Sequence, residues 1–93
     1  MSERWARTAE ILNQRGLHAR ASAAFAREAS KWNAKVVVKH EGQTANAVSI
    51  MDLMMLVASK GCVVEIEAEG AQAKEALDGL CDLIGRKFDE EPE

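Results

Sequence analysis

The segment from Cys62 to Glu69 constrains the fold more than any other part of the chain. Apolar and acidic residues alternate along it, so that Val64, Ile66 and Ala68 share one face of a strand and the glutamates share the other. A strand with one apolar face and one charged face is typical of an antiparallel sheet that meets water on one side. We therefore expect such a sheet, with helices covering its apolar face.

The rest of the chain alternates strand and helix signals with short connections. The expected elements are strands over Trp5–Leu12, Lys35–Lys39 and Gln43–Ala45, and helices over Ala21–Trp32, Ser49–Val57 and Ala73–Ile84. Lys60-Gly61 is expected to close the second helix. The order is βαββαβα, which predicts an α/β (α+β) open-faced sandwich with three helices on one face of a four-stranded antiparallel sheet. We expect a single domain over residues 1–93, with an acidic, frayed tail over 88–93.

Composition excludes several classes of function. The chain has 93 residues and a net charge of −3, whereas a general nucleic-acid binder is normally basic. No apolar run approaches the ~20 residues of a membrane span, and no signal peptide is evident. The two cysteines lack the spacing of metal ligands. We expect a cytoplasmic protein that binds no metal or organic cofactor.

The motif Gly16-Leu17-His18-Ala19-Arg20 stands where a loop turns into the first helix. No Ser, Thr, Asp or Asn occupies the capping position, so His18 itself falls near the N-cap. Unpaired N–H groups at a helix start favour an anion, whereas the helix dipole disfavours the cationic Arg20 there. An imidazole, free amides and a guanidinium together predict a phosphoryl site with the imidazole as nucleophile.

This motif resembles the active-site signature of HPr, the histidine-containing phosphocarrier family of the bacterial phosphotransferase system. A second block, from Thr44 to Met51, is similar to the family's regulatory segment, and the resemblance runs from about Thr8 to Ile84. It implies a carrier that accepts a phosphoryl group on His18 from enzyme I and passes it to a histidine of an EIIA-type acceptor. Such a protein is not an enzyme with its own turnover, and it needs no cofactor.

The resemblance also implies roles for single residues. Arg20 would orient the phosphoryl group, and the backbone N–H groups of Ala19 and Arg20 would add donors. The sequence itself leaves both ring nitrogens of His18 open, whereas the resemblance implies Nδ1. The residues expected to bind partners are Leu17, Ile50, Met51 and Met54. A carrier that presents one small face is expected to be a monomer.

The helix over Ser49–Val57 has more apolar residues than one buried face needs. We expect Ile50, Leu53 and Leu56, or their neighbours, in the core, which leaves Met51 and Met54 as an exposed, adaptable patch.

Ser49 admits two interpretations. With Asp52 it approximates a capping box, so a plain N-cap explains it. The resemblance adds regulatory phosphorylation by an HPr kinase/phosphorylase. Two departures from the family pattern bear on this: Val48 replaces a common lysine and Asp52 a common glycine. Asp52 would repel a phosphate on Ser49.

Two departures lie elsewhere. Ala21 stands directly after Arg20, where relatives typically have a proline, which leaves an additional amide or the Ser22 hydroxyl near the site. The ending Phe88-Asp89-Glu90 is similar to that of carriers in the nitrogen-related branch, where phosphate flows to a regulatory acceptor.

Plainer interpretations stay open at this point. A lone histidine is most often a solvated or capping side chain, and His40 is interpreted as an ordinary surface residue. A small acidic acyl carrier would also place a serine at a helix start, but Ser49 lacks the Asp-Ser-Leu context and the strands contradict an all-helical fold. The third class is a non-covalent ligand-binding module in which His18 only caps its helix.

Overall fold

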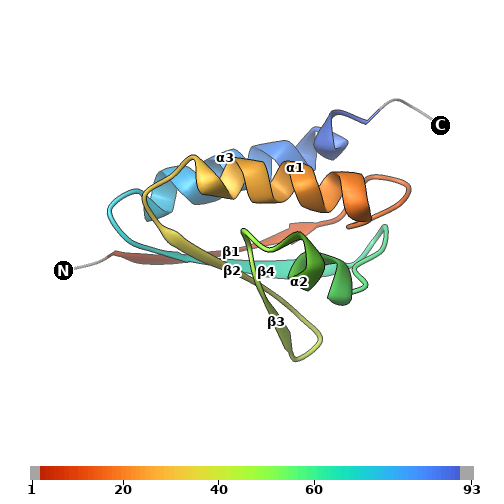
Figure 1. Ribbon diagram of the computed structural model, residues 1–93, viewed down its shortest axis with the longest axis horizontal. Coiled ribbons are helices and arrows are strands. Elements are labelled where there is room, and N and C mark those ends of the chain that lie inside the picture. Colours follow the sequence, from red (N-terminus) through yellow and green to blue (C-terminus); the bar gives the residue numbers. More distant parts are fainter. Residues whose placement is uncertain (1–2, 91–93) are drawn as a thin grey trace.

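Three helices lie on one face of a four-stranded antiparallel sheet in the computed structural model, which describes residues 3–90 (Figure 1). The elements in chain order are β1 (Arg4–Glu10), α1 (Ala19–Ser30), β2 (Lys35–His40), β3 (Gln43–Asn46), α2 (Ile50–Met55), β4 (Val63–Glu69), α3 (Ala73–Gly85) and a short 3-10 turn, η1 (Lys87–Asp89). The expected βαββαβα order and open-faced sandwich are confirmed.

The sheet has the order β1-β4-β2-β3, with every neighbouring pair antiparallel. The central position of β4 agrees with its alternating sequence, since Val64, Ile66 and Ala68 are buried under the helices. On the opposite face Lys39 Nζ donates to Glu67 Oε2 at 3.0 Å across the β2–β4 pair. One face of the sheet is therefore core and the other is charged, as the alternation predicts.

Helices α1 and α3 lie side by side over the sheet and run in opposite directions (Figure 1). The apolar stripe of α3 is buried, and Phe25 of α1 packs into the same core. Because the two helices are antiparallel, the start of α1 and the end of α3 lie at the same end of the molecule (Figure 1). This arrangement brings the His18 loop next to the C-terminal segment.

Two of the three expected helices end earlier than predicted. Helix α1 stops at Ser30 rather than Trp32. Helix α2 stops at Met55 with Leu56 as its C-cap, so the expectation that Lys60-Gly61 closes it is wrong. Val57, with φ of 52°, reverses the chain instead. Gly61 belongs to the following turn, where the Cys62 N–H donates to the Ser59 carbonyl at 3.0 Å.

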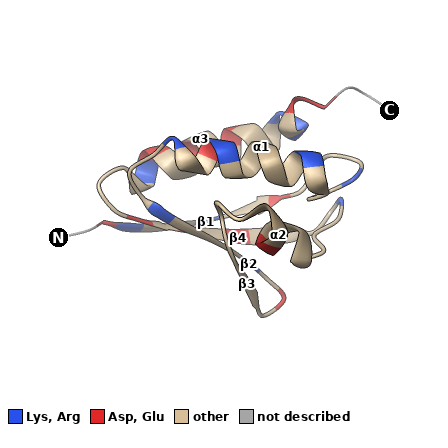
Figure 2. Ribbon diagram, viewed as in Figure 1, with Lys and Arg blue, Asp and Glu red and all other residues tan. Residues whose placement is uncertain are grey.

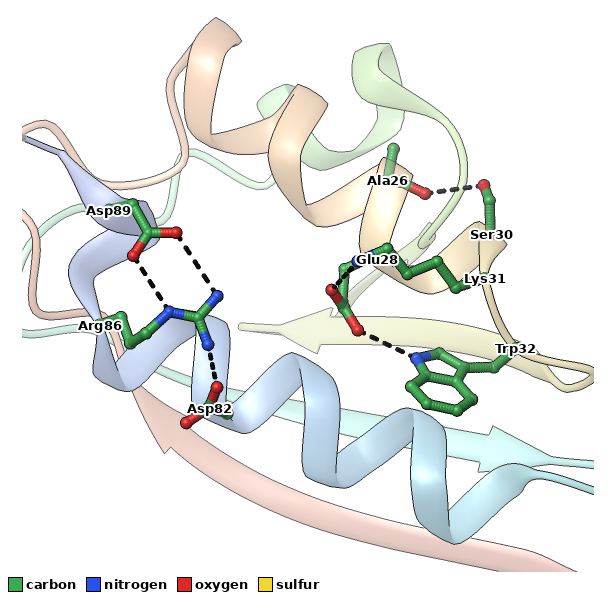
Figure 3. Close-up of polar contacts among 8 residues, drawn as sticks. All are labelled: Ala26, Glu28, Ser30, Lys31, Trp32, Asp82, Arg86 and Asp89. Carbon is green, nitrogen blue, oxygen red and sulfur yellow. Dashed lines mark hydrogen bonds and ion pairs between the residues drawn. The ribbon is translucent and has the colours of Figure 1, made fainter.

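The C-terminal segment is ordered as far as Glu90, which corrects the expectation of a frayed tail over 88–93; residues 91–93 lie outside the described part. Phe88 is buried in the core. The Arg86 guanidinium binds Asp82 on α3 and Asp89 on η1, and thereby ties the turn to the helix (Figure 3). The composition of the tail suggested disorder, but Phe88 supplies an apolar anchor that fixes it.

Within residues 3–90, no helix combines the length and the apolarity that crossing a membrane would require.

The core position of α2 gives a direct test of the packing. Leu53 is 0% exposed and Met51 is 69% exposed on the same helix. Leu53→Ala should therefore lower the free energy of unfolding by about 2–5 kcal/mol. Met51→Ala should change it by no more than about 0.5 kcal/mol. Urea denaturation of both variants measures the difference, and equal losses would contradict this placement of the helix.

Candidate functional site

A tight turn sets the position of the His18 loop. Gly16 has φ of +63°, and its N–H donates to the Asn13 carbonyl at 3.2 Å. A Cβ at this position would lie 2.3 Å from the Ala58 carbonyl oxygen. The next residue, Leu17, donates its N–H to that same oxygen at 2.9 Å. Glycine is thus required both for its backbone angle and for the close approach to the α2–β4 connection.

His18 is the N-cap of α1, as predicted, with extended backbone angles and no side-chain bond to the first turn. Its carbonyl accepts the first helical hydrogen bond, from the Ser22 N–H at 2.8 Å. The N–H groups of Ala19 and Arg20 in the first turn therefore have no acceptor within the helix. With the positive end of the helix dipole, they form an electropositive opening beside the imidazole.

The His18 ring also contacts a carboxylate from the far end of the chain. Nε2 hydrogen-bonds to Glu90 Oε2, which lies 72 residues away in sequence. The other carboxylate oxygen, Oε1, accepts from Asn13 Nδ2 at 3.0 Å, and this amide also donates to the Gly16 carbonyl at 2.8 Å. Asn13, His18 and Glu90 therefore form one hydrogen-bonded cluster.

The electrostatics of this cluster favour an ionised Glu90. Partial burial acts to raise the pKa of the Glu90 carboxyl. The hydrogen bonds from His18 and Asn13, together with electrostatic attraction from His18 and Arg20, outweigh that effect, so the pKa of Glu90 lies below its ordinary value. Arg20 is exposed, and its positive charge makes a smaller contribution to the lowered pKa of this carboxyl.

An apolar surface adjoins the histidine on the other side. A shallow hollow of about 230 Å³ is lined by His18 together with Arg15, Leu17, Met54, Val57, Ala58 and Ser59. Around it, several large apolar side chains are exposed: Val48, Ile50, Met51, Met54, Met55 and Val57. We call these six residues the α2 surface. Asp52 is the single charged residue of α2 (Figure 2).

The expected partner-binding residues divide into two groups. Met51 and Met54 are exposed, as predicted. Ile50 is 42% exposed and not in the core, which leaves it accessible to a partner, whereas Leu53 and Leu56 are core as expected. Leu17 is only 5% exposed and packs in the core, which leaves it little surface to offer a partner. Helix α2 is too short to bury a residue in its first turn as well as Leu53 and Leu56.

Ser49 caps α2. Its Oγ accepts from the Asp52 N–H at 3.2 Å, which is the predicted N-cap bond. The Asp52 carboxylate does not return the bond to Ser49 but accepts from the Asn46 N–H at 3.2 Å. The motif is therefore a cap that ties α2 back to β3, and it accounts for both residues structurally.

Two remaining expectations need correction. The hydroxyl of Ser22 is buried and donates to the Leu17 carbonyl at 3.2 Å, so it is not free at the site. His40 is not an ordinary surface residue, since its side chain is largely buried and its Nδ1 lies 3.4 Å from the Val63 carbonyl oxygen.

Across residues 3–90, no group of three or more His, Cys, Asp or Glu side chains is placed to hold a metal ion.

Sequence reasoning missed Asn13 and Glu90, and it did not single out Met55 and Val57. Asn13 could have been found, because an asparagine three residues before a turn glycine commonly bonds to that turn. Glu90 gave no such signal, since nothing in the local sequence indicates a contact 72 residues away.

Comparison with known proteins shows which proteins this chain is similar to. The family profile described as PTS HPr component phosphorylation site matches residues 5–86. The phosphocarrier protein HPr of Neisseria meningitidis serogroup A is 48% identical over 81 residues, which cover 87% of this chain and 91% of that protein. The phosphocarrier protein NPr of Shewanella violacea is 37% identical over 84 residues, covering 90% and 92%. A crystal structure of HPr-C-His from Thermoanaerobacter tengcongensis aligns with a TM-score of 0.90 at 44% identity, covering 95% of this chain and 99% of that one.

The turn before His18 predicts a large effect from a small substitution. Gly16→Ala should destabilise the protein by about 2–4 kcal/mol, because it combines a left-handed backbone angle with a backbone clash. Gly85→Ala is the matched control, since a Cβ there would meet nothing within 4 Å. Urea denaturation compares the two. A Gly16→Ala variant as stable as the control would contradict the close approach to Ala58.

The lowered pKa of Glu90 predicts the direction of a pH effect. A carboxyl whose pKa is lower in the folded state contributes stability above its unfolded pKa, and this contribution is lost as pH falls through the folded pKa. The loss should thus begin below the ordinary glutamate value of about 4.3. NMR titration of the Glu90 side-chain carboxyl carbon measures the midpoint. A midpoint at or above the ordinary value would contradict the contacts with His18 and Asn13.

Proposed function

The chain belongs to the HPr family of phosphocarrier proteins of the phosphotransferase system, and from this premise we propose that it carries its phosphoryl group on His18. Members of this family are carriers without turnover of their own. The observation that supports His18 is its position: the imidazole caps an open helix N-terminus, beside unpaired N–H groups, with an exposed apolar surface next to it. Of the two histidines in the chain, only His18 has this setting.

In the proposed step, Nδ1 of His18 attacks the phosphorus of a phosphohistidine on enzyme I. The new N–P bond forms as the donor's N–P bond breaks, and the electron pair of the broken bond returns to the donor imidazole. The N–H groups of Ala19 and Arg20 and the Arg20 guanidinium are donors for the phosphoryl oxygens. Because the reacting nitrogens belong to two proteins, most of the rate depends on how the proteins hold them in line.

We propose that enzyme I and an EIIA-type acceptor dock in turn on the α2 surface. Its methionines suit a surface that meets two different partners, because their flexible side chains adapt to different shapes. The surface lies beside His18, as the shared lining of Met54 and Val57 in the hollow indicates. Leu17 is left out of the docking face because it is buried.

Three finer predictions accompany this role. Relatives of the chain include both HPr and NPr proteins, so a nitrogen-related role remains a prediction. A monomeric carrier remains a prediction as well. Phosphorylation of Ser49 by an HPr kinase/phosphorylase would have to displace the cap bond to the Asp52 N–H, and it would bring a phosphate close to the Asp52 carboxylate.

The assignment of His18 predicts a specific modification. After incubation with phosphoenolpyruvate and its cognate enzyme I, the intact protein should gain the mass of one phosphoryl group, which acid removes. His18→Ala should gain none, while His40→Ala should gain it normally. A His18→Ala protein that is still modified, or a wild-type protein that is not, would overturn the assignment.

If both partners dock on the α2 surface, one substitution there should slow both phosphoryl-transfer steps. Met51→Lys should slow phosphoryl transfer from enzyme I and to the acceptor about tenfold at limiting partner concentration, because it puts a charge at an apolar contact. Gln43→Lys is the control, since it adds the same charge at an exposed position on the β2–β3 hairpin. If the two variants transfer at the same rate, the surface is not the docking site.

A further inference from the structure

A side chain from the end of the chain occupies one of the two ring nitrogens of His18. Glu90 Oε2 contacts Nε2. An ionised carboxylate offers only lone pairs, so the hydrogen of this bond must come from Nε2. The neutral imidazole then carries its single N–H at Nε2 and keeps the lone pair at Nδ1.

The Glu90 carboxylate is itself held in place. Its other oxygen accepts from Asn13 Nδ2 at 3.0 Å, and Asn13 is anchored to the Gly16 carbonyl in the turn before His18. The Glu90 side chain is 10% exposed and that of His18 is 22% exposed. The contact is largely enclosed, and the carboxylate accepts a second hydrogen bond from within the protein. It is therefore held more firmly than a solvated surface ion pair.

The backbone that delivers Glu90 is also fixed. Lys87, Phe88 and Asp89 all have φ between 56° and 58°, a conformation that costs L residues energy. It persists because Phe88 is buried and Arg86 holds Asp89 (Figure 3). The Glu90 N–H donates to the Lys87 carbonyl at 3.1 Å, which completes the turn.

We propose that Glu90 is a positioning residue, which holds His18 as the Nε2–H tautomer and so presents the Nδ1 lone pair to the incoming phosphorus. This inference rests on the proposed function of His18. In the transfer step the Nε2 proton stays on its nitrogen. The positive charge that develops on the ring as the N–P bond forms is shared with the Glu90 carboxylate through that proton. Arg20, whose positive charge also acts on this carboxylate, is exposed and available to the phosphoryl oxygens.

The test uses Glu90→Gln, which keeps the size of the side chain but removes its charge. The control is Asp89→Asn, which removes a carboxylate from the neighbouring residue, tolerates the left-handed angle and keeps an acceptor for Arg86. Two-bond proton–nitrogen NMR on ¹⁵N-histidine-labelled protein, at a pH where His18 is neutral, gives the ratio of the two tautomers. Phosphorylation by enzyme I and phosphoenolpyruvate gives the rate.

We expect Glu90→Gln to lower the ratio of the Nε2–H to the Nδ1–H tautomer roughly fivefold and to slow phosphorylation by a similar factor. Asp89→Asn should change neither quantity. An unchanged tautomer ratio, a rate that does not follow the ratio, or faster phosphorylation of Glu90→Gln would overturn the proposal; the last result would mean that the carboxylate obstructs the ring. The tautomer measurement needs no phosphoryl donor. If His18 failed to accept phosphate, the proposed function would be wrong, and the tautomer ratio would still test whether Glu90 sets the tautomer of His18.

Discussion

The close approach of the Gly16 turn to the carbonyl of Ala58 holds the site together. It joins the loop before α1 to the connection after α2, through the Leu17 N–H bond and the absence of a side chain at Gly16. Leu17 is drawn into the core, and His18 follows it as the residue that begins α1. This contact adds a backbone link between the start of α1 and the chain after α2, next to the direct packing of α1 on α2. It therefore helps to hold His18 beside the α2 surface.

The chemistry of the imidazole depends on the opposite side of the ring. The antiparallel arrangement of α1 and α3 brings the end of α3 to the start of α1 (Figure 1). Glu90, which directly follows η1, hydrogen-bonds there to His18 Nε2. The helix start and Arg20 then provide positive charge for a phosphoryl group, while Glu90 provides negative charge for the ring that carries it.

Much of this architecture follows from sequence patterns. The alternation in β4 predicted a sheet with one face in the core and the other in solvent. The absence of Ser, Thr, Asp or Asn at the capping position correctly predicted His18 as the N-cap of α1. The parts that could not be predicted depend on tertiary contacts. Burial of Phe88 orders a segment whose acidic composition indicated fraying, and α2 ends at Met55, before the Lys60-Gly61 pair that was expected to close it. Glu90 reaches His18 only through the packing of α3 on α1, which no local pattern encodes.

The central claim is that Nδ1 of His18 receives the phosphoryl group because Nε2 is held by Glu90. Phosphorus–nitrogen coupling in ¹⁵N-histidine-labelled protein, phosphorylated with enzyme I and phosphoenolpyruvate, tests it most directly. We predict a one-bond coupling from phosphorus to Nδ1 of His18, with the hydrogen still on Nε2. Coupling to Nε2, or to His40, would contradict the account.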